Sequence, residues 1–321
     1  MRLFLISILL SILIINCNRI PSPHSHKPEP DRKNLQGSLK IAGAYALAPF
    51  IQACADSLRL ANPYAVFRVT ATGHDSAMIS LESGDIDLAM ISRKLGPKEE
   101  HDFFAIAVAK TGIVLIFNSK NPVRNEILSH GLTINDLQNA FSGEDVLFWD
   151  KFIKRGKNTP VSVYIRKEQS GAAEVLADFL FMDPNDFRGI PVSGENEMIA
   201  AIQKDSLGLG FCNINDAFDL KSKERLAFLE FLPLDLNMNG TIEDREQICT
   251  NLDDFQNSIC HNTYPVKLSR NLYLVAKNKP SDTLTLAFMD YILTTGQKYI
   301  IPMGYSEISG SLLKYNRFLL D

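Results

Sequence analysis

Short apolar runs and longer periodic segments alternate along the chain from Gly37 onward. Runs rich in β-branched side chains predict strands, and apolar residues spaced three and four apart predict helices. The predicted strands are 39–42, 65–72, 86–91, 103–109, 112–118, 161–165, 207–211 and 272–276. The predicted helices are 47–60, 76–81, 134–141, 171–181, 195–202 and 283–293. Because strands and helices alternate, the pattern predicts an α/β fold with a mainly parallel sheet.

The N-terminal segment carries an export pattern. Arg2 precedes an apolar run, Leu3 to Ile15, that is shorter than the ~20 residues of a membrane-spanning helix and typical of a secretory signal. The run ends in Ile14-Ile15-Asn16-Cys17, which resembles a bacterial lipobox. Residues 1–16 are therefore predicted to be a lipoprotein signal peptide and Cys17 the lipidated residue, with a plain signal peptide as the alternative. The proline-rich residues 17–36 predict an extended tether.

Length, charge and cysteine content restrict the possible functions of the chain. The 321 residues suggest two domains, at about 150 residues each. A net charge of −4 argues against nucleic-acid binding, which usually requires a basic face. Cys249 and Cys260 lie in a polar loop of a chain that is expected to be exported, so a disulfide between them is possible.

Short motifs occur along the chain in an order shared with one family. They include Gly84-Asp85-Ile86-Asp87, Ile91-Ser92-Arg93, Phe141-Ser142-Gly143, Ser170-Gly171, Asn196-Glu197 and Arg270-Asn271-Leu272-Tyr273. Together they resemble the phosphate-binding solute receptors of bacterial ABC importers, a branch of the type II periplasmic-binding-protein fold.

The resemblance implies an α/β fold of two lobes, each a mainly parallel sheet flanked by helices, with a ligand cleft between them. Lobe 1 is expected at 37–115 plus 265–321, and lobe 2 at 116–264, including a polar insertion at 235–262. The implied protein is a monomer, anchored by its lipid and facing the periplasm or cell exterior. It binds phosphate or a related oxyanion and delivers it to the membrane subunits of an ABC importer.

The resemblance also implies an oxyanion site made of backbone amides at helix N-termini, hydroxyl groups and one arginine. The matching positions are Ala46, Leu47, His74, Ser92, Arg93, Arg166, Ser170, Gly171 and Ala172. Arg166 is expected to be the main charge partner. The alternatives are that Arg166 forms a surface salt bridge, that Ser170 is only a helix N-cap, and that His74 is a loop bystander.

Several positions depart from the family pattern. Three of them carry alanine where the family has Ser or Thr: Ala44, Ala46 and Ala172. His74 replaces a serine, so its protonation would make anion affinity depend on pH. Asp75 next to it would repel an anion unless its carboxylate faces away.

A second motif is independent of the resemblance. The segment from Asp235 to Glu246 fits a twelve-residue calcium loop. Its expected ligands are Asp235, Asn237, Asn239, the backbone carbonyl of Thr241, and Glu246. The motif predicts a structural Ca²⁺ that orders the insertion, and an Asn-Gly turn decorated with acidic residues is the alternative. No catalytic cofactor is expected.

Two other functions compete with a transport receptor. The missing hydroxyl groups favour a degenerate receptor that senses anions or binds a partner without transport. A secreted phosphatase needs a nucleophile with a base and usually a cluster of metal ligands. The six histidines are scattered, so the sequence predicts that the protein is not an enzyme.

Overall fold

The structure, a computed structural model, describes residues 34–143, 146–150, 159–168, 170–244, 246 and 251–321. These residues belong to one compact unit, residues 32–321. The predicted signal peptide 1–16, Cys17 and most of the tether lie outside the described residues. Leu35 is buried in a hydrophobic cluster, and its amide donates to Asn62 Oδ1 at 3.0 Å. The fold therefore begins before residue 36, where the tether was predicted to end.

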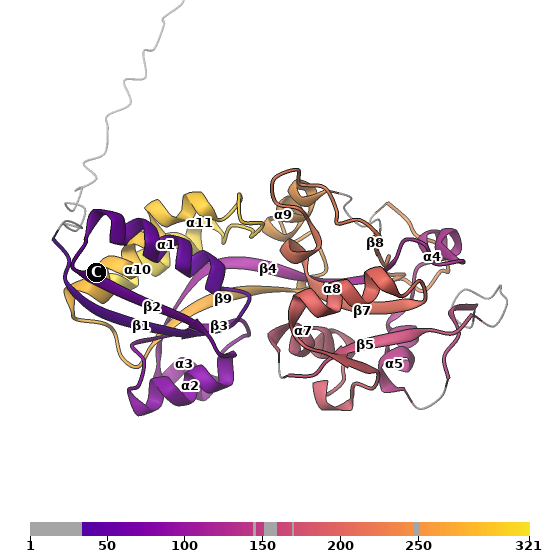
Figure 1. Ribbon diagram of the computed structural model, residues 1–321, viewed down its shortest axis with the longest axis horizontal. Coiled ribbons are helices and arrows are strands. Elements are labelled where there is room, and N and C mark those ends of the chain that lie inside the picture. Colours follow the sequence, from indigo (N-terminus) through magenta and orange to yellow (C-terminus); the bar gives the residue numbers. More distant parts are fainter. Residues whose placement is uncertain (1–33, 144–145, 151–158, 169, 245, 247–250) are drawn as a thin grey trace, which may run out of the picture. The chain divides into compact units, whose positions relative to one another are not determined.

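The described strands form a mixed sheet (Figure 1). They are β1 (Gly37–Gly43), β2 (Ala65–Ala71), β3 (Leu88–Ile91), β4 (Phe104–Asn118), β5 (Ser162–Arg166), β6 (Ile190–Val192), β7 (Gly208–Asn213), β8 (Leu229–Phe231) and β9 (Ser269–Ala276). Their order is β2-β1-β3-β9-β4-β7-β5-β6, and β8 pairs with β4. Parallel pairs join β2 to β1 and β1 to β3 in one half, and β7 to β5 and β5 to β6 in the other.

The antiparallel pairs all involve β4 or β9. The prediction placed two separate strands at 103–109 and 112–118, but β4 runs continuously through both. It pairs with β9 from Phe104 to Gly112 and with β7 from Ile113 to Phe117. The α/β class is confirmed, and these two long strands explain why the sheet is mixed.

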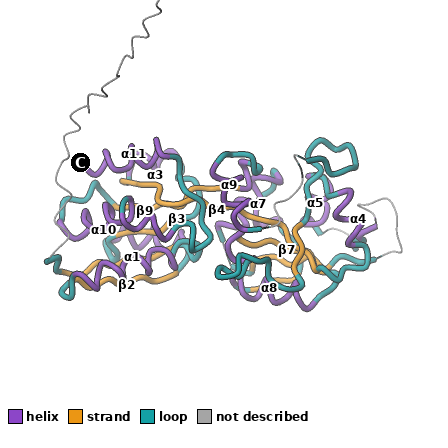
Figure 2. Tube along the Cα trace, turned by 90° about the horizontal axis from the view of Figure 1, so that it is seen from above, coloured by secondary structure: helices purple, strands orange, loops and turns teal. Residues whose placement is uncertain are grey.

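The described helices are α1 (Ala48–Ala61), α2 (His74–Ser83), α3 (Pro97–Asp102), α4 (Arg124–His130), α5 (Ile134–Ser142), α7 (Gly171–Leu180), α8 (Gly194–Lys204), α9 (Leu252–Cys260), α10 (Thr283–Leu293) and α11 (Gly310–Leu320). Short 3₁₀ turns occur at η1 (Pro184–Asp186), η2 (Ile214–Ala217), η3 (Val266–Leu268) and η4 (Thr295–Tyr299). In the first half, α1 and α10 cover one face of the sheet and α2 the other (Figure 1). In the second half, α7 and α8 pack on opposite sides of β7 (Figure 2).

The hydrophobic core is divided into two lobes. The main lobe 1 cluster includes Leu39 through Ala109 and resumes at Leu272. The lobe 2 cluster extends from Ile113 to Leu268. The boundary between the two cores therefore lies within the paired strands β4 and β9. The predicted boundary assigned Ile113 to Leu115 to lobe 1, but these residues belong to the core of lobe 2. Two adjacent strands that cross together form the connection at which the lobes can move relative to each other.

The insertion 235–262 contains the helix α9, which was not predicted. Its N-cap is Asn251, whose side chain accepts from the Asp254 amide, and its apolar face buries Leu252, Phe255 and Ile259. Cys260, in the last turn of this helix, is a free cysteine. Cys249 lies outside the described residues. The possible disulfide between Cys249 and Cys260 therefore stays a prediction.

Among the described helices, none has the length and apolar character needed to cross a membrane.

Candidate functional site

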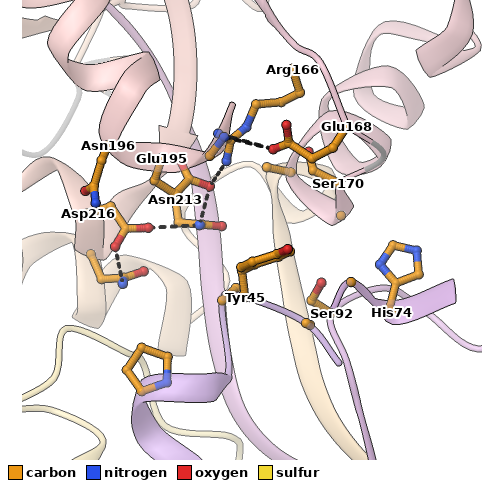
Figure 3. A pocket seen from close by; sticks show the side chains of 18 of the residues that line it. Tyr45, His74, Ser92, Arg166, Glu168, Ser170, Glu195, Asn196, Asn213 and Asp216 are labelled. Atoms are coloured by element: carbon orange, nitrogen blue, oxygen red, sulfur yellow. Dashed lines mark hydrogen bonds and ion pairs between the residues drawn. The ribbon is translucent and has the colours of Figure 1, made fainter. Parts of the chain in front are cut away.

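A cavity of about 720 Å³ is lined by residues of both lobes (Figure 3). Lobe 1 and the crossing strand β9 contribute Ala44, Tyr45, Ala46, Pro49, Gly73, His74, Ser92, Arg270 and Tyr305. Lobe 2 contributes Arg166, Glu168, Ser170, Gly171, Ala172, Ser193, Gly194, Glu195, Asn196, Glu197, Asn213, Asn215 and Asp216. Strand ends and helix N-termini dominate this lining, which is where α/β folds place their ligands.

The N-terminus of α7 opens into the cavity. Ser170 is its N-cap, and the Ser170 hydroxyl accepts from the Ala173 amide at 3.1 Å. Gly171 and Ala172, the first two helical residues, line the cavity. The first amides of a helix have no partner within it and carry the positive end of the helix dipole, so they attract an anion.

Two further donors reach the same helix end. A Cβ added to Gly171 would clash with Ser92 Oγ and lie 2.9 Å from Arg270 Nη1. Arg270 is buried on β9, and its Nη2 donates to Asn213 Oδ1 at 2.8 Å. Its Nε and Nη1 have no hydrogen-bond partner among the described residues. Glycine at position 171 therefore allows a serine hydroxyl and a guanidinium group to approach the helix N-terminus.

The N-terminus of α8 also lines the cavity, but acidic side chains already occupy it. The Ser193 amide donates to Glu197 Oε2 at 2.8 Å, and the Gly194 amide donates to Glu168 Oε1 at 3.0 Å. Glu195, Asn196 and Glu197 form the first turn of this helix. The chain's own carboxylates thus take the place that an anion would have at this helix end.

Arg166, at the end of β5, faces these carboxylates. Its Nη2 forms an ion pair with Glu195 Oε1, and its Nη1 lies 3.7 Å from Glu168 Oε1. The side chain is only 4% exposed, and its Nε and Nη1 lack a hydrogen-bond partner among the described residues. The expected ligand arginine is therefore at the cavity, yet it is also tied to lobe 2 acids.

Buried acids and an amide connect the two arginines. Asn213 Nδ2 donates to Glu195 Oε1 at 2.7 Å and to Asp216 Oδ2 at 2.9 Å. Burial raises the pKa of the Glu195 carboxyl to about 7, a change that Asp216 reinforces and the two arginines oppose. Burial also raises the pKa of Asp216 and lowers that of Arg270 to about 10. This end of the cavity is a tightly packed charge network.

His74 connects the lobes at the edge of the cavity. Its ring is 3% exposed at the N-terminus of α2, and Nε2 lies 3.0 Å from Glu174 Oε1 on α7 and 3.3 Å from Asp75 Oδ1. His74 thus lines the cavity and uses its ring nitrogen to contact lobe 2.

Comparison with protein families identifies the fold. A model of the PBP superfamily domain matches residues 29–295. The chain belongs to the PBP superfamily. Among its relatives, the phosphate-binding protein PstS of Pseudomonas aeruginosa is 25% identical over 300 residues, which cover 84% of this chain and 83% of that protein. The phosphate-binding protein PstS 2 of Streptococcus pneumoniae is 22% identical over 138 residues, 43% of this chain and 45% of that one.

Solved structures share the same fold. An ABC-type phosphate transport receptor from Vibrio cholerae matches with a TM-score of 0.65 and 19% identity, covering 84% of this chain and 99% of that one. PstS from Borrelia burgdorferi matches with a TM-score of 0.54 and 19% identity, covering 85% and 100%. The predicted two-lobed type II periplasmic-binding-protein fold is confirmed.

Within this PBP-superfamily fold, most of the expected site residues lie at the cavity. Those that line it are Ala46, His74, Ser92, Arg166, Ser170, Gly171 and Ala172. The alternative of a surface salt bridge for Arg166 is wrong, because its side chain is buried. Ser170 does act as an N-cap, and it lines the cavity as well.

Two of the expected ligands, Arg93 and Leu47, do not line the cavity. Arg93 donates from Nη1 to Glu99 Oε2 at 2.7 Å and from Nη2 to Glu99 Oε1 at 2.8 Å. This ion pair holds the guanidinium group away from the cavity. The pair raises the pKa of Arg93 and lowers that of Glu99. The Leu47 side chain is fully buried, and its amide donates to the Ala44 carbonyl at 3.1 Å, so that amide is already used.

Asp75 does not line the cavity either. Its Oδ1 lies near His74 and 3.7 Å from Arg93 Nη2. The expected repulsion of an anion by Asp75 is therefore reduced by its orientation and by a neighbouring cation.

The sequence reasoning missed the buried network of Arg270, Glu195, Asn213 and Asp216. Arg270 did carry a signal, since it alternates with Leu272 and Leu274 on the buried face of β9. A charged residue at an inward strand position is almost always paired or functional. Glu195 and Asp216 carried no such signal, because they lie in a helix turn and a 3₁₀ turn, where acidic residues are common.

Proposed function

We propose that this protein is an exported solute receptor that binds a tetrahedral oxyanion, phosphate first among them, and delivers it to an ABC importer. The observation that carries this proposal is the open N-terminus of α7, with Ser92 Oγ and Arg270 Nη1 beside it in a cavity between two lobes. Backbone amides, a hydroxyl and a guanidinium group are the donors that bind a dehydrated oxyanion. The phosphate-binding relatives support the same ligand.

Isothermal titration of the purified, phosphate-stripped protein with phosphate tests this proposal. We expect saturable binding, weakened about fivefold to tenfold in Ser92→Ala, because one hydrogen bond to a charged ligand is lost. Ser76→Ala, which removes an exposed hydroxyl from α2, is the matched control and should bind like the native protein. The absence of binding heat with phosphate, arsenate and sulfate would contradict the proposal.

A degenerate receptor that senses anions or binds a partner is the second candidate. It is favoured by the loss of donors, because Leu47 and Arg93 bond within the protein and Ala44, Ala46 and Ala172 carry no hydroxyl. Phosphate uptake by vesicles that contain the importer separates the two candidates. Uptake that depends on added receptor supports transport, whereas phosphate binding without uptake supports sensing.

The proposed role is binding without catalysis. The relatives from Pseudomonas aeruginosa and Streptococcus pneumoniae are phosphate-binding proteins. Hydrolysis of a chromogenic phosphate ester by the purified protein, absent from a matched preparation of Gly171→Ala, would contradict this part of the proposal.

We further propose that the mature protein is a monomer anchored through lipid on Cys17. Support comes from the lipobox-like sequence before Cys17 and the proline-rich residues that follow it. Intact-mass spectrometry should show a diacylated N-terminus that Cys17→Ser removes. Light scattering in detergent, corrected for bound detergent, should give the mass of one chain.

The Asp235 to Glu246 loop is proposed to hold a structural Ca²⁺. The Asp235 and Glu246 side chains are 3% and 9% exposed, and none of the ion pairs among the described residues involves them. Backbone amides orient both carboxylates: Asn239 and Gly240 donate to Asp235, and Leu236 and Asn237 donate to Glu246. Buried carboxylates without a cation are costly, and Ca²⁺ would balance both charges.

The loop backbone supports this assignment. Gly240, at the sixth place, has φ 79°, a left-handed conformation that favours glycine. The residues present therefore fit the ion, with side-chain oxygens of Asp235, Asn237, Asn239 and Glu246 and the Thr241 carbonyl as ligands. When bound, the ion would supply charge balance and rigidity only.

Thermal unfolding with Ca²⁺ and with a chelator tests the calcium site. Ca²⁺ at about 100 times its Kd adds about 2.7 kcal/mol, which should raise Tm by roughly 5 °C. The shift should vanish in Asp235→Asn and persist in Asp244→Asn, a control in the same loop that is exposed and lies at a non-ligand place. Equal shifts in both variants would contradict the assignment.

A further inference from the structure

The cavity has two chemically different ends. Figure 3 shows Ser92, His74 and Ser170 on one side and Asn196, Glu195 and Asp216 on the other, with the exposed Tyr45 between them. The volume of about 720 Å³ lies within the range of roughly 300–1,000 Å³ in which proteins hold organic ligands. A single inorganic oxyanion bound at one end would leave the other end unused.

The first end donates hydrogen bonds. Gly171 opens α7, the Ser92 hydroxyl lies beside it, and Arg270 Nη1 is buried there without a partner among the described residues. These groups recognise the oxygens of a tetrahedral anion.

The second end combines an unpaired acceptor on Glu195 with the Arg166 guanidinium group, whose Nε and Nη1 have no hydrogen-bond partner among the described residues. Glu195 Oε2 is buried and has no partner among the described residues, although Glu195 Oε1 accepts from Asn213 and pairs with Arg166. An acceptor left without a donor in a closed site is costly, so a ligand that supplies a donor there is favoured. The N-terminus of α8 cannot take an anion at this end, because Glu197 and Glu168 already accept from its first amides.

The charge of the lining points the same way. Four carboxyl groups line the cavity, on Glu168, Glu195, Glu197 and Asp216, against two guanidinium groups, on Arg166 and Arg270. Burial raises the pKa of Glu195 and Asp216, so the negative charge of the lining grows as pH rises. Ionised carboxylates in the lining repel a phosphate dianion. A ligand whose anionic group is joined to a cation carries less net charge and matches both ends.

Building on the proposed phosphate-binding role, we propose that the preferred ligand is a zwitterionic organic phosphate or phosphonate. Its tetrahedral group binds at the N-terminus of α7 with Ser92 and Arg270, and its ammonium group donates to Glu195 Oε2. A short linker between the two groups spans the cavity past Tyr45. Ammonium has three donors and no acceptor, and it therefore matches the unpaired oxygen of Glu195.

Titration with three probes tests the inference: inorganic phosphate, ethyl phosphate and O-phosphoethanolamine. The last two differ in one ammonium group. We expect O-phosphoethanolamine to bind at least about tenfold more tightly than ethyl phosphate, the effect of one charge-assisted hydrogen bond. In Glu195→Gln the ratio of these two affinities should fall below about threefold. In Glu82→Gln, which makes the same charge change on the exposed surface of α2, the ratio should be unchanged.

Equal affinities for the two organic probes in the native protein would overturn the inference, as would phosphate binding tenfold more tightly than O-phosphoethanolamine. Either result leaves the proposed phosphate receptor intact. If none of the three probes binds, both proposals fail. The native protein alone decides between these outcomes, so the inference stays testable even if Glu195→Gln does not fold.

Discussion

Two helices present their N-termini to one cavity, and only one of them is open to an anion. At α7 the first residues are Gly171 and Ala172, with the Ser92 hydroxyl and an arginine nitrogen close by. At α8 the amides of Ser193 and Gly194 already donate to Glu197 and Glu168. The backbone dipole is the same at both ends, so the side chains around it decide whether a helix N-terminus binds ligand or is capped by the protein itself.

The largest expected effect comes from closing the open helix end. Gly171→Ala places a methyl group against Ser92 and 2.9 Å from Arg270 Nη1, so the lobes cannot approach each other around the ligand. We expect phosphate affinity by titration to fall about 100-fold, which corresponds to roughly 2.8 kcal/mol.

Gly310→Ala is the matched control, because a Cβ at Gly310, the first residue of α11, meets no atom within 4 Å. It should bind phosphate like the native protein. Equal affinity of Gly171→Ala and the native protein would show that α7 is not the anion site.

The second expected effect is a difference in phosphate affinity between variants of Arg270 and Arg166. Arg270 has a free nitrogen beside α7, whereas Arg166 pairs with the carboxylates around α8. Arg270→Met should therefore lower phosphate affinity at least about tenfold more than Arg166→Met does. Both variants break a buried charge network and should lose stability, by about 3–5 kcal/mol. Titration at low temperature, after circular dichroism confirms folding, measures the difference, and a larger affinity loss in Arg166→Met would reverse the assignment.

The third effect is a pH dependence that originates beside α8. Burial raises the pKa of Glu195 to about 7 from its ordinary value of 4.5. Between these two pH values the folded protein holds a proton that the unfolded chain has lost, so stability falls as pH rises through this window. The slope is at most on the order of 1.4 kcal/mol per pH unit for this group.

Urea unfolding from pH 4.5 to 7.5 should show a flatter slope in Glu195→Gln than in the native protein. A residual slope of the same sign is expected from Asp216, whose pKa burial also raises. Identical slopes in the two proteins would mean that Glu195 is ionised throughout this range.

The smallest effect concerns the capped helix end. Glu197→Ala removes the acceptor of the Ser193 amide and should lower the free energy of unfolding by about 1 kcal/mol or less, since the site is exposed. Phosphate affinity should stay within about twofold, because Glu168 still caps Gly194. A large gain in affinity would show that α8 can bind the anion once it is uncapped. Chemical denaturation and titration of the same preparation provide both numbers.

The local patterns at α7 and around Arg166 were predictable from sequence. Ser170 before a glycine and an apolar periodic run marks a helix start, and alternation marks β5. The family resemblance assigned Arg93 to the site together with Ser92, as ligands at the end of a strand. It could not show that Glu99, in the first turn of α3, forms an ion pair with the Arg93 guanidinium group.

Long-range pairing explains the remaining failures. The two segments 103–109 and 112–118 were predicted as separate strands, because nothing local shows that β9 continues beside β4. His74 could not be assigned a partner, since Glu174 lies 100 residues away. The role of Arg270 depends on Gly171 and Asn213, which come from other strands and helices.

The sequence by itself determined the α/β class, the family motifs, the helix start at Ser170 and the calcium-loop spacing, because each depends on residues close together in the chain. Only the tertiary structure decided which helix N-terminus is open, which arginine faces it, and where His74 and Arg93 bond. Those outcomes depend on how buried charges from distant segments pair once water is excluded. Such pairing depends on three-dimensional proximity, which no local pattern encodes.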